Sequence, residues 1–177
     1  MDSEVTAAAA AAPGCTAKSF PSEGSRDHVT SDPTYTVSFP PLSGAHNATW
    51  ANYGFYTSPV PFKFLVHNLE HGGIVIYYGP NVAPAALSAL RSLRAKEPAY
   101  AVVVPLNAPQ FPSNAVVATS WQRWLSCKPF SAAQISAVEV FLKTYRGTGP
   151  EPIAGSNSGG SAPGLPLPAE ADKRAKQ

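Results

Sequence analysis

Charged side chains are scarce in this sequence. They make up 14% of the 177 residues, and the formal net charge is only +2. A surface that binds nucleic acid needs clustered positive charge to neutralise phosphates, and a disordered polyelectrolyte needs a high net charge of one sign. We therefore expect no nucleic-acid partner for this chain.

Long apolar runs are also missing. The alanine stretch Ala7–Ala12 is much shorter than the roughly 18 apolar residues that a membrane-spanning helix requires. A secretory leader would place basic residues before an apolar segment, whereas this chain begins with the acidic residues Asp2 and Glu4. We therefore expect no membrane span in this chain, and an exported form would have its leader removed or outside this sequence.

Several catalytic signatures are absent as well: the GxSxG nucleophile elbow, the phosphate-binding Walker loop, the dinucleotide-binding glycine fingerprint and the CxxC pair. The only two cysteines, Cys15 and Cys127, are far apart in the sequence. They form either one disulfide, which fits an oxidising compartment, or one buried thiol and one idle thiol. The residues themselves leave both alternatives open.

Prolines and glycines, in contrast, are abundant, at 19 and 13, and many of them lie near the ends. Residues 1–17 are alanine-rich without an amphipathic pattern, and residues 153–177 are rich in Gly, Ser and Pro before becoming charged. Such segments cannot bury enough apolar area to fold. We predict a disordered leader, one globular domain over residues 18–152, and a disordered tail.

Within this domain, residues 18–61 lack a helical period and predict loops with short extended pieces. Three later runs of β-branched and aromatic residues are bounded by Gly, Pro or Asn, which is typical of buried strands. These runs are Gly73–Tyr78, Tyr100–Pro105 and Val116–Trp121.

Two helices complete the pattern. Pro84 suits a first helical turn, and leucines then recur along one side until Pro98. Ser131 followed by Gln134 has the spacing of a capping box, and the apolar side of that second helix continues to Gly147. The order predicts an α+β (or α/β) domain: a small mixed β-sheet with two packed helices and a long irregular N-terminal loop region.

The residues that could carry chemistry lie in the segment HNLEH, which contains His67, Glu70 and His71. On a helix or on a strand, a spacing of four places both imidazoles on the same side. On a helix the HxxEH arrangement can hold a metal ion and place a carboxylate to activate water. However, the apolar residues before the motif and Gly72 and Gly73 after it predict a strand, a tight turn and another strand.

A metal site with less specific geometry needs more ligands than these two histidines, because transition metals usually bind three or four. The remaining imidazoles in the chain are His46 and His28, and Asp27 could add a carboxylate. The alternative is that a histidine simply forms a buried hydrogen bond with Glu70 and has a structural role.

With these residues assembled, the chain resembles a bacterial family known as domain of unknown function 3105, over about residues 20–151. The resemblance rests on HV at His28, PPLSGAH at Pro40–His46, GFY near Tyr56, LVHNLEHGGIVIYY at Leu65–Tyr78, the Trp and Cys of Trp121–Cys127, and YRGTGPE at Tyr145–Glu151. The family pattern usually has PPTSGPH, so this chain departs from it at Leu42 and Ala45.

The resemblance implies a location outside the cytoplasmic membrane, behind a leader or anchor, and such a location favours the disulfide between Cys15 and Cys127. It supplies no activity. All four histidines and Glu70 fall within the family's motifs, which favours a shared functional role for them.

The first hypothesis is an extracytoplasmic domain that binds copper or zinc through His46, His67 and His71, with His28 as a fourth ligand and Glu70 as a ligand or orienting residue. The second is a metal-dependent hydrolase in which Glu70 is the general base. The third is a non-catalytic cell-envelope binding module that uses the aromatic segment Trp50–Tyr56 and has purely structural histidines.

Overall fold

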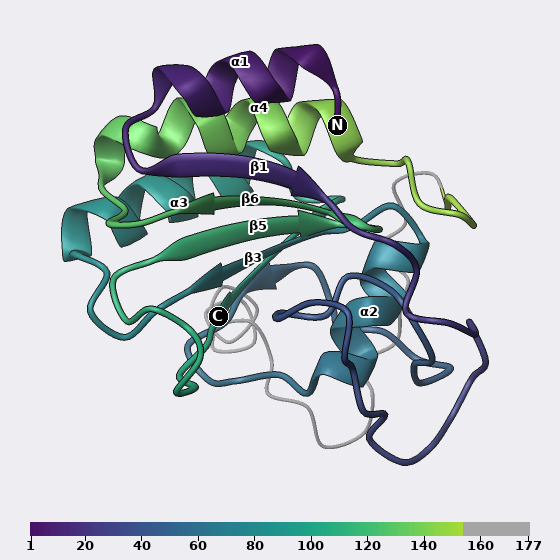
Figure 1. The fold of residues 1–177 in the computed structure, drawn as a ribbon. Coiled ribbons are helices and arrows are strands. Elements are labelled where there is room, and N and C mark those ends of the chain that lie inside the picture. The colour runs from purple at the N-terminus through teal and green to yellow at the C-terminus, as the bar shows by residue number, and fades with distance from the viewer. Residues whose placement is uncertain (154–177) are drawn as a thin grey trace.

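A six-stranded mixed sheet with the strand order β1-β6-β5-β3-β4-β2 forms the centre of the molecule (Figure 1). The computed structural model describes residues 1–153. The strands are β1 Cys15–Ser19, β2 Gly54–Phe55, β3 Ile74–Tyr78, β4 Ala101–Pro105, β5 Val116–Ser120 and β6 Arg123–Cys127. Strand β4 pairs in parallel with β2 and β3, and the other pairs are antiparallel. This confirms the predicted α+β class and mixed sheet.

The helices are α1 Ser3–Ala11, α2 Phe62–Glu70, α3 Pro84–Lys96 and α4 Ile135–Tyr145, and a 3₁₀ turn, η1 Ala132–Gln134, leads into α4. In Figure 1, α1, α3 and α4 lie on one side of the sheet, whereas α2 and the loops of residues 20–61 lie on the other. None of the helices in residues 1–153 combines the length and apolarity that a bilayer crossing requires.

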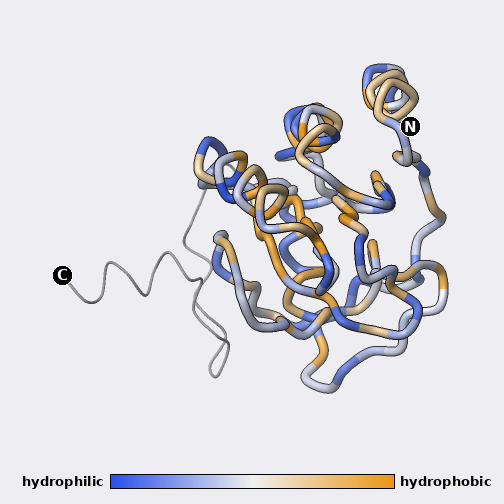
Figure 2. Tube along the Cα trace, turned by 90° about the vertical axis from the view of Figure 1, so that its left-hand side faces the viewer, coloured by the Kyte–Doolittle hydropathy of each residue, from blue (hydrophilic) through white to orange (hydrophobic). Residues whose placement is uncertain are grey.

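Both faces of the sheet are buried, and the central strand β3 shows why its sequence is apolar throughout. Ile74 and Ile76 point into a core shared with α3 and α4, while Val75 and Tyr77 point into a second core shared with α2. All five residues of β3 are buried. A strand covered on both faces needs a continuous apolar run rather than alternation. Apolar segments accordingly concentrate where the helices meet the sheet (Figure 2).

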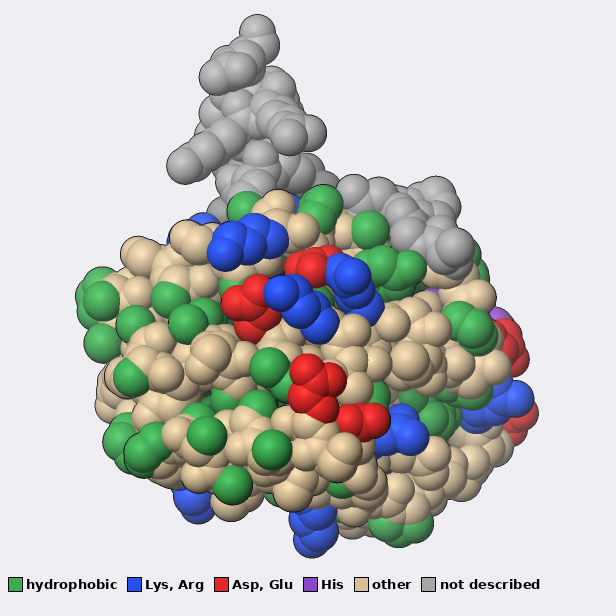
Figure 3. Space-filling model, turned by 90° about the horizontal axis from the view of Figure 1, so that it is seen from above, with side chains coloured by type: hydrophobic (Ala, Val, Ile, Leu, Met, Phe, Trp, Pro, Cys, Tyr) green, Lys and Arg blue, Asp and Glu red, His purple; other side chains and the backbone are tan. Residues whose placement is uncertain are grey.

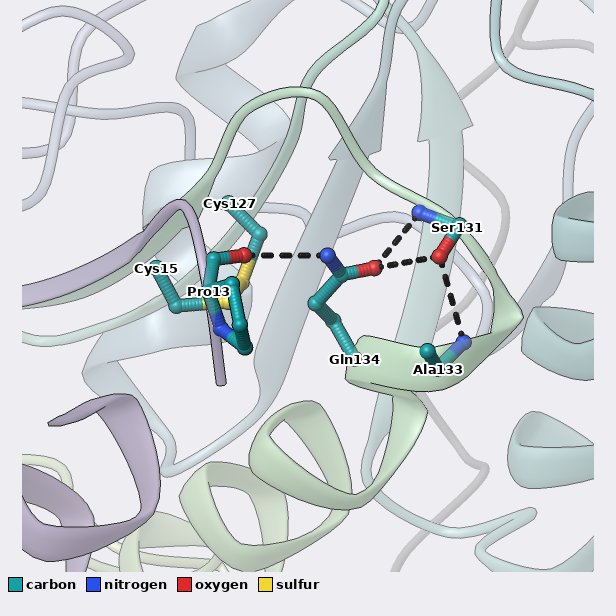
Figure 4. Close-up of a disulfide and its surroundings, with 6 residues drawn as sticks. All are labelled: Pro13, Cys15, Cys127, Ser131, Ala133 and Gln134. Atoms are coloured by element: carbon teal, nitrogen blue, oxygen red, sulfur yellow. Dashed lines mark hydrogen bonds between the residues drawn. A yellow bond between two sulfur atoms is a disulfide. The ribbon is translucent and has the colours of Figure 1, made fainter. Parts of the chain in front are cut away.

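The strands and helices predicted after residue 72 are present. Ser131 and Gln134 form the predicted capping box, with Gln134 Oε1 accepting from the Ser131 backbone at 2.7 Å. Gln134 also reaches back to the carbonyl of Pro13, at 3.0 Å (Figure 4). The N-terminal chain is therefore fastened to the start of the last helix.

The disulfide between Cys15 and Cys127 is present, which settles the alternative that the cysteine count left open. The two residues are direct partners in the antiparallel pairing of β1 with β6. Figure 4 shows the bridge beside Pro13 and the capping box. Cys127 is buried in the core, so the bridge ties an edge strand to the centre of the fold.

The prediction of a disordered leader over residues 1–17 is wrong for α1 and β1. Helix α1 packs on α4 with Val5 and Ala9 buried, and the backbone N–H of Asp2 donates to the hydroxyl of Tyr145 at 2.8 Å. Alanine has the highest intrinsic helix propensity and allows close packing, so the segment needs no strong amphipathic stripe. The domain therefore begins near Ser3, and the predicted tail lies, apart from Ile153, outside the described residues.

The outer face formed by α1 and α4 carries acidic and basic side chains close together, without a broad region of one sign (Figure 3). Lys143 and Glu139 on α4 pair at 2.6 Å as i and i+4 neighbours. Histidine side chains show only at the rim of this view. The candidate chemistry thus belongs to the other side of the sheet, where α2 lies.

Candidate metal centre

Helix α2 carries His67 and Glu70, and His71 is its C-cap residue. The predicted strand, turn and strand at this segment is wrong. The helix begins after Pro61, and Gly72, at φ +81°, ends it in the left-handed conformation that favours glycine. A Cβ at Gly72 would lie 2.6 Å from the backbone of Gly147, so glycine also permits this close approach.

The flanking apolar residues misled the sequence interpretation because every residue from Leu65 to Glu70 is buried. The polar residues Lys63, His67 and Glu70 do recur at helical spacing, but the helix has only 9 residues, and two glycines follow its C-cap, which favoured the interpretation as a strand and a turn. On the actual helix, His67 and Glu70 stand one turn apart, as the HxxEH spacing requires.

His46 and His28 come from two loop segments that form an isolated parallel bridge. The backbone N–H of Val29 donates to the carbonyl of His46 at 2.7 Å, and that of His46 donates to the carbonyl of Asp27 at 3.1 Å. The bridge brings the two imidazole rings to a centroid distance of 5.1 Å. Asp27 takes part through its backbone and is not one of the residues that group around the site.

Four side chains meet at this point: His28, His46, His67 and Glu70. Each offers one ligand atom, and these four atoms all lie within 4.8 Å of one another. His46, His67 and Glu70 are buried, whereas His28 is exposed. Atoms this close have a common point within about 3 Å of each, and imidazole nitrogens bind metals at about 2.0–2.1 Å. The group could therefore hold a metal ion after small movements.

His71 lies beside this group rather than inside it. Its Nε2 atom is 2.7 Å from Nε2 of His67, and its ring is partly exposed. All four histidines of the chain are therefore in one place. The structure brings together the side chains that the sequence singled out: His28, His46, His67, His71 and Glu70.

Backbone carbonyls fix three of the four imidazoles in the same way. Nδ1 of His46 contacts the carbonyl of Gly44 at 2.8 Å, and Nδ1 of His67 contacts that of Asn47 at 2.5 Å. Nδ1 of His71 contacts the carbonyl of Glu151 at 2.6 Å. A carbonyl oxygen only accepts hydrogen bonds, so each Nδ1 carries the proton. In the neutral rings each Nε2 then carries a lone pair.

Glu70 is 2% exposed and has a partner on each side. Its Oε1 lies 3.3 Å from a guanidinium nitrogen of Arg26, and its Oε2 lies 2.9 Å from Nε2 of His46. The contact with His46 lacks hydrogen-bond geometry, and Nε2 of His46 is a buried nitrogen without a hydrogen-bond partner in the described residues. Buried polar atoms are usually partnered, so the close approach of this nitrogen and this carboxylate oxygen suits a cation shared between them.

The protonation of His67 is set by its surroundings. The pKa of His67 is lowered from 6.5 to about 4: burial is the largest cause, the hydrogen bond to Asn47 opposes it, and the neighbouring imidazoles of His46, His71 and His28 add to the lowering. His67 is therefore neutral at physiological pH. A neutral imidazole is the form that binds metal ions.

Trp50, which belongs to the aromatic segment that the sequence singled out, and Arg26, which the sequence did not single out, complete the surroundings. Trp50 stands edge-on to the rings of His67 and His71, at 4.9 and 5.0 Å between centroids. Arg26 contacts both Glu70 and Glu151. The contacts of the backbone carbonyls could not be predicted from the sequence, because every residue has a carbonyl. The contact of Arg26 could not be predicted either, because a single arginine is compatible with many roles.

The aromatic segment Trp50–Tyr56 does not form a binding surface. Tyr53, Phe55 and Tyr56 are buried, and Phe55 and Tyr56 belong to opposite cores of the sheet. Of the aromatic residues in this segment only Trp50 is half-buried, so the third hypothesis would have to rest on Trp50 rather than on the whole segment. Large aromatic side chains here supply core area instead.

Comparison with protein families gives one match, over residues 28–158, to the family described as "Protein of unknown function (DUF3105)". The matched region contains all four histidines and Glu70. Comparison with curated proteins and with solved structures gives no match.

Proposed function

We propose that this chain, which belongs to the DUF3105 family, is a metal-binding domain that holds one copper or zinc ion in its histidine cluster. The ligands are His28, His46, His67 and Glu70, joined by His71 at the edge. The observation that carries the proposal is the common orientation of three imidazoles, in which Nδ1 is hydrogen-bonded to a carbonyl and Nε2 faces the cluster; Nε2 of His46 has no hydrogen-bond partner in the described residues, and those of His67 and His71 contact each other.

Metal-binding histidines almost always donate their second ring N–H to a carbonyl or a carboxylate, which fixes the tautomer and raises the basicity of the binding nitrogen. Three such contacts, from His46, His67 and His71, occur here around one point. Purely structural histidines would be expected to use both nitrogens in hydrogen bonds to other groups. The unpartnered Nε2 of His46 supports a ligand role over a structural one.

Glu70 supports the same function as a ligand. The imidazoles bring no negative charge, and a divalent cation in a buried site is stabilised by a nearby carboxylate. Arg26 holds Oε1 of Glu70, which leaves Oε2 directed at His46. Arg26 is therefore placed to orient the carboxylate.

A hydrolytic role for Glu70 as general base is less well supported. A general base must reach a water molecule and exchange protons with it. Glu70 is 2% exposed, and both of its carboxylate oxygens already have close partners. We therefore propose binding of the ion, without catalysis, as the function of the site.

We also propose that the domain works outside the cytoplasm. The disulfide between Cys15 and Cys127 supports this location, because such bonds persist in oxidising compartments and are rare in reducing ones. Nitrogen and carboxylate ligands suit copper(II) and zinc, the forms of these metals that do not need thiolate ligands.

Metal binding to chelator-treated protein tests the proposal. Copper(II) and zinc are titrated separately into the wild type and into the His46→Ala and His67→Ala variants, with bound metal measured by elemental analysis after desalting. We expect one ion per wild-type chain and a loss of at least 100-fold in affinity in each variant. Glu139→Gln, which removes a carboxylate on the distant α4 face, is the matched control and should bind normally. A wild type that retains no more metal than the two histidine variants would overturn the proposal.

A further inference from the structure

Two of the four clustered side chains come from loops: apart from the bridge between His28 and His46, residues 20–53 contain neither helix nor strand. Such loops hold a ligand in place only where other contacts fix them. We infer that Glu23 is a positioning residue of the cluster, which keeps the carbonyl of Gly44 against Nδ1 of His46 and so keeps His46 directed at the other ligands. This inference rests on the proposed function, because it assigns a supporting residue to the same site.

The carboxylate of Glu23 holds a neighbouring loop segment. Its Oε1 accepts hydrogen bonds from the backbone N–H and from the hydroxyl of Thr36, the latter at 2.8 Å, and its Oε2 accepts from the backbone N–H of Val37 at 2.7 Å. Burial acts to raise the pKa of Glu23, but these hydrogen bonds outweigh it and hold the pKa below its ordinary value. The side chain is therefore ionised at neutral pH, and hydrogen bonds to a charged acceptor are stronger than those between neutral groups.

The rest of Glu23 lies against the turn that leads to His46. Its backbone N–H donates to Oγ of Ser43 at 2.8 Å, and Ser43 is 1% exposed. Its side-chain stem packs on Gly44, because a Cβ added to Gly44 would lie 3.0 Å from Cβ of Glu23 and 3.1 Å from Cγ. Gly44 has φ +114°, a conformation that favours glycine. Glu23 therefore supports the backbone whose carbonyl accepts from Nδ1 of His46 at 2.8 Å.

Tyr35 supports the same turn from the segment that Glu23 holds. The hydroxyl of Tyr35 donates to the carbonyl of Ala45 at 2.9 Å, and its ring would lie 3.3 Å from a Cβ at Gly44. Tyr35 directly precedes Thr36, which is bound to the carboxylate of Glu23. Loss of that carboxylate should therefore weaken both contacts on the turn, the direct one from Glu23 and the one from Tyr35.

Glu23 also begins the segment that brings two further side chains to the cluster. Arg26, three residues later, contacts the carboxylate of Glu70, and His28 follows two residues after that. This segment is joined to the turn at two points: at Glu23 through Ser43, and at His28 through the bridge with His46. A displacement of the turn would therefore move both loop histidines, and outer contacts of this kind affect the affinity of a metal site through the orientation of its ligands.

Two variants test the inference. Glu23→Gln keeps the size of the side chain, but one of its terminal groups becomes a donor that faces a backbone N–H donor. Thr36→Val removes only the hydroxyl that donates to Glu23 and keeps the shape of the side chain. The matched controls lie on the other side of the sheet: Glu139→Gln on α4, and Thr6→Val on α1, where the threonine hydroxyl donates to the carbonyl of Asp2.

Two measurements are made on the chelator-treated full chain. Competition titration gives the affinity for copper(II). Nuclear magnetic resonance of the metal-free protein follows the Nδ1 proton of His46, assigned by its loss in His46→Ala, and measures how fast that proton exchanges with water. Urea unfolding confirms that each variant is folded under the conditions used.

We expect copper(II) binding to weaken about 10-fold in Glu23→Gln and about 3-fold in Thr36→Val, and to stay unchanged in both controls. The Nδ1 proton of His46 should exchange at least about 5-fold faster in Glu23→Gln, because the turn that protects it opens more often. Folded variants with wild-type affinity and wild-type proton exchange would overturn the inference and leave the proposed function standing. A wild type that binds neither copper(II) nor zinc would instead refute the proposed function, and the proton exchange would still show whether Glu23 positions His46.

Discussion

Oε2 of Glu70 lies 2.9 Å from Nε2 of His46, in a contact where both side chains are buried. Nδ1 of His46 donates to the carbonyl of Gly44, so the neutral ring presents a lone pair to the carboxylate. Two buried acceptors that face each other are repulsive until a cation lies between them. In the proposed metal-bound protein an ion would lie between these two atoms, so the energy of the pair should differ between the metal-free and the metal-bound protein.

The substitution Glu70→Gln should have different effects on the stability of the metal-free protein and on its affinity for metal. A glutamine amide can donate to Nε2 of His46, so at pH 8 the metal-free variant should unfold within about 1 kcal/mol of the wild type. Its copper(II) affinity should fall by about 10–100-fold, because the amide is a weak ligand and carries no charge. Urea unfolding and metal titration measure the two effects. A variant that is strongly destabilised without metal would show that Glu70 mainly forms an ion pair with a protonated His46.

The low pKa of His67 predicts that acid destabilises the metal-free protein. The folded-state pKa is about 4 and the ordinary value is 6.5, so between these values the unfolded chain binds a proton that the folded chain does not. The free energy of unfolding should fall by about 1.4 kcal/mol per pH unit across this window, or about 3 kcal/mol in total, and should be independent of His67 above it.

Urea unfolding of the chelator-treated protein between pH 4 and pH 8 measures this dependence. His67→Gln is the comparison, because glutamine has a similar reach and does not titrate. The difference in unfolding free energy between wild type and variant should change by about 3 kcal/mol over that range. A constant difference would mean that His67 titrates near its ordinary pKa.

Much of the fold could be predicted where local signals agree with the final packing. The runs that became β3, β4 and β5 are apolar because they are covered on both faces. The capping box of Ser131 and Gln134 could be predicted because it is a local motif, in which the two residues are three positions apart. Strand β6 was missed because its burial is mixed and its pairing with β1 and β5 is long-range.

For the candidate site, too, the local features could be predicted from the sequence and the long-range contacts could not. Residue type and spacing singled out the four histidines and Glu70, but the geometry depends on α2, a helix of only 9 residues that lies between a proline and two glycines and was therefore interpreted as a strand and a turn. The carbonyls that fix the rings belong to Gly44, Asn47 and Glu151, and any residue supplies a carbonyl. Such contacts follow from tertiary structure alone.

The disulfide should stabilise the fold mainly through the unfolded chain. It joins residues separated by 112 positions, and closing a loop of that length is worth up to about 5 kcal/mol in the chain-entropy model. Cys15→Ala breaks the bridge and keeps the buried sulfur of Cys127 in place. We expect its unfolding free energy, measured with urea under reducing conditions, to lie about 3–5 kcal/mol below that of the oxidised wild type. Full reduction of the wild type should reproduce this loss, and a change below about 1 kcal/mol in both would contradict the prediction.

Gly149 controls the segment that anchors His71. The backbone N–H of Gly147 donates to the carbonyl of Gly72 at 2.8 Å, and that of Glu151 donates to the carbonyl of Glu70 at 3.0 Å, so this segment lies against the end of α2. A Cβ at Gly149 would lie 2.1 Å from the carbonyl oxygen of Glu70, which is backbone and cannot rotate away. Gly149→Ala must therefore push the segment off α2 and carry the carbonyl of Glu151 away from Nδ1 of His71.

We expect Gly149→Ala to lose about 1–3 kcal/mol of stability and to bind copper(II) about 10-fold or more weakly, since an imidazole without its anchoring contact is a poorer ligand. Thermal unfolding and copper(II) titration measure the two effects. Pro150→Ala, at an exposed neighbouring position, is the control and should change neither quantity much. If Gly149→Ala lowers stability and leaves the copper(II) affinity and spectrum unchanged, the Glu151 carbonyl does not position His71, and the ring holds its place through its packing on Trp50 and His67 alone.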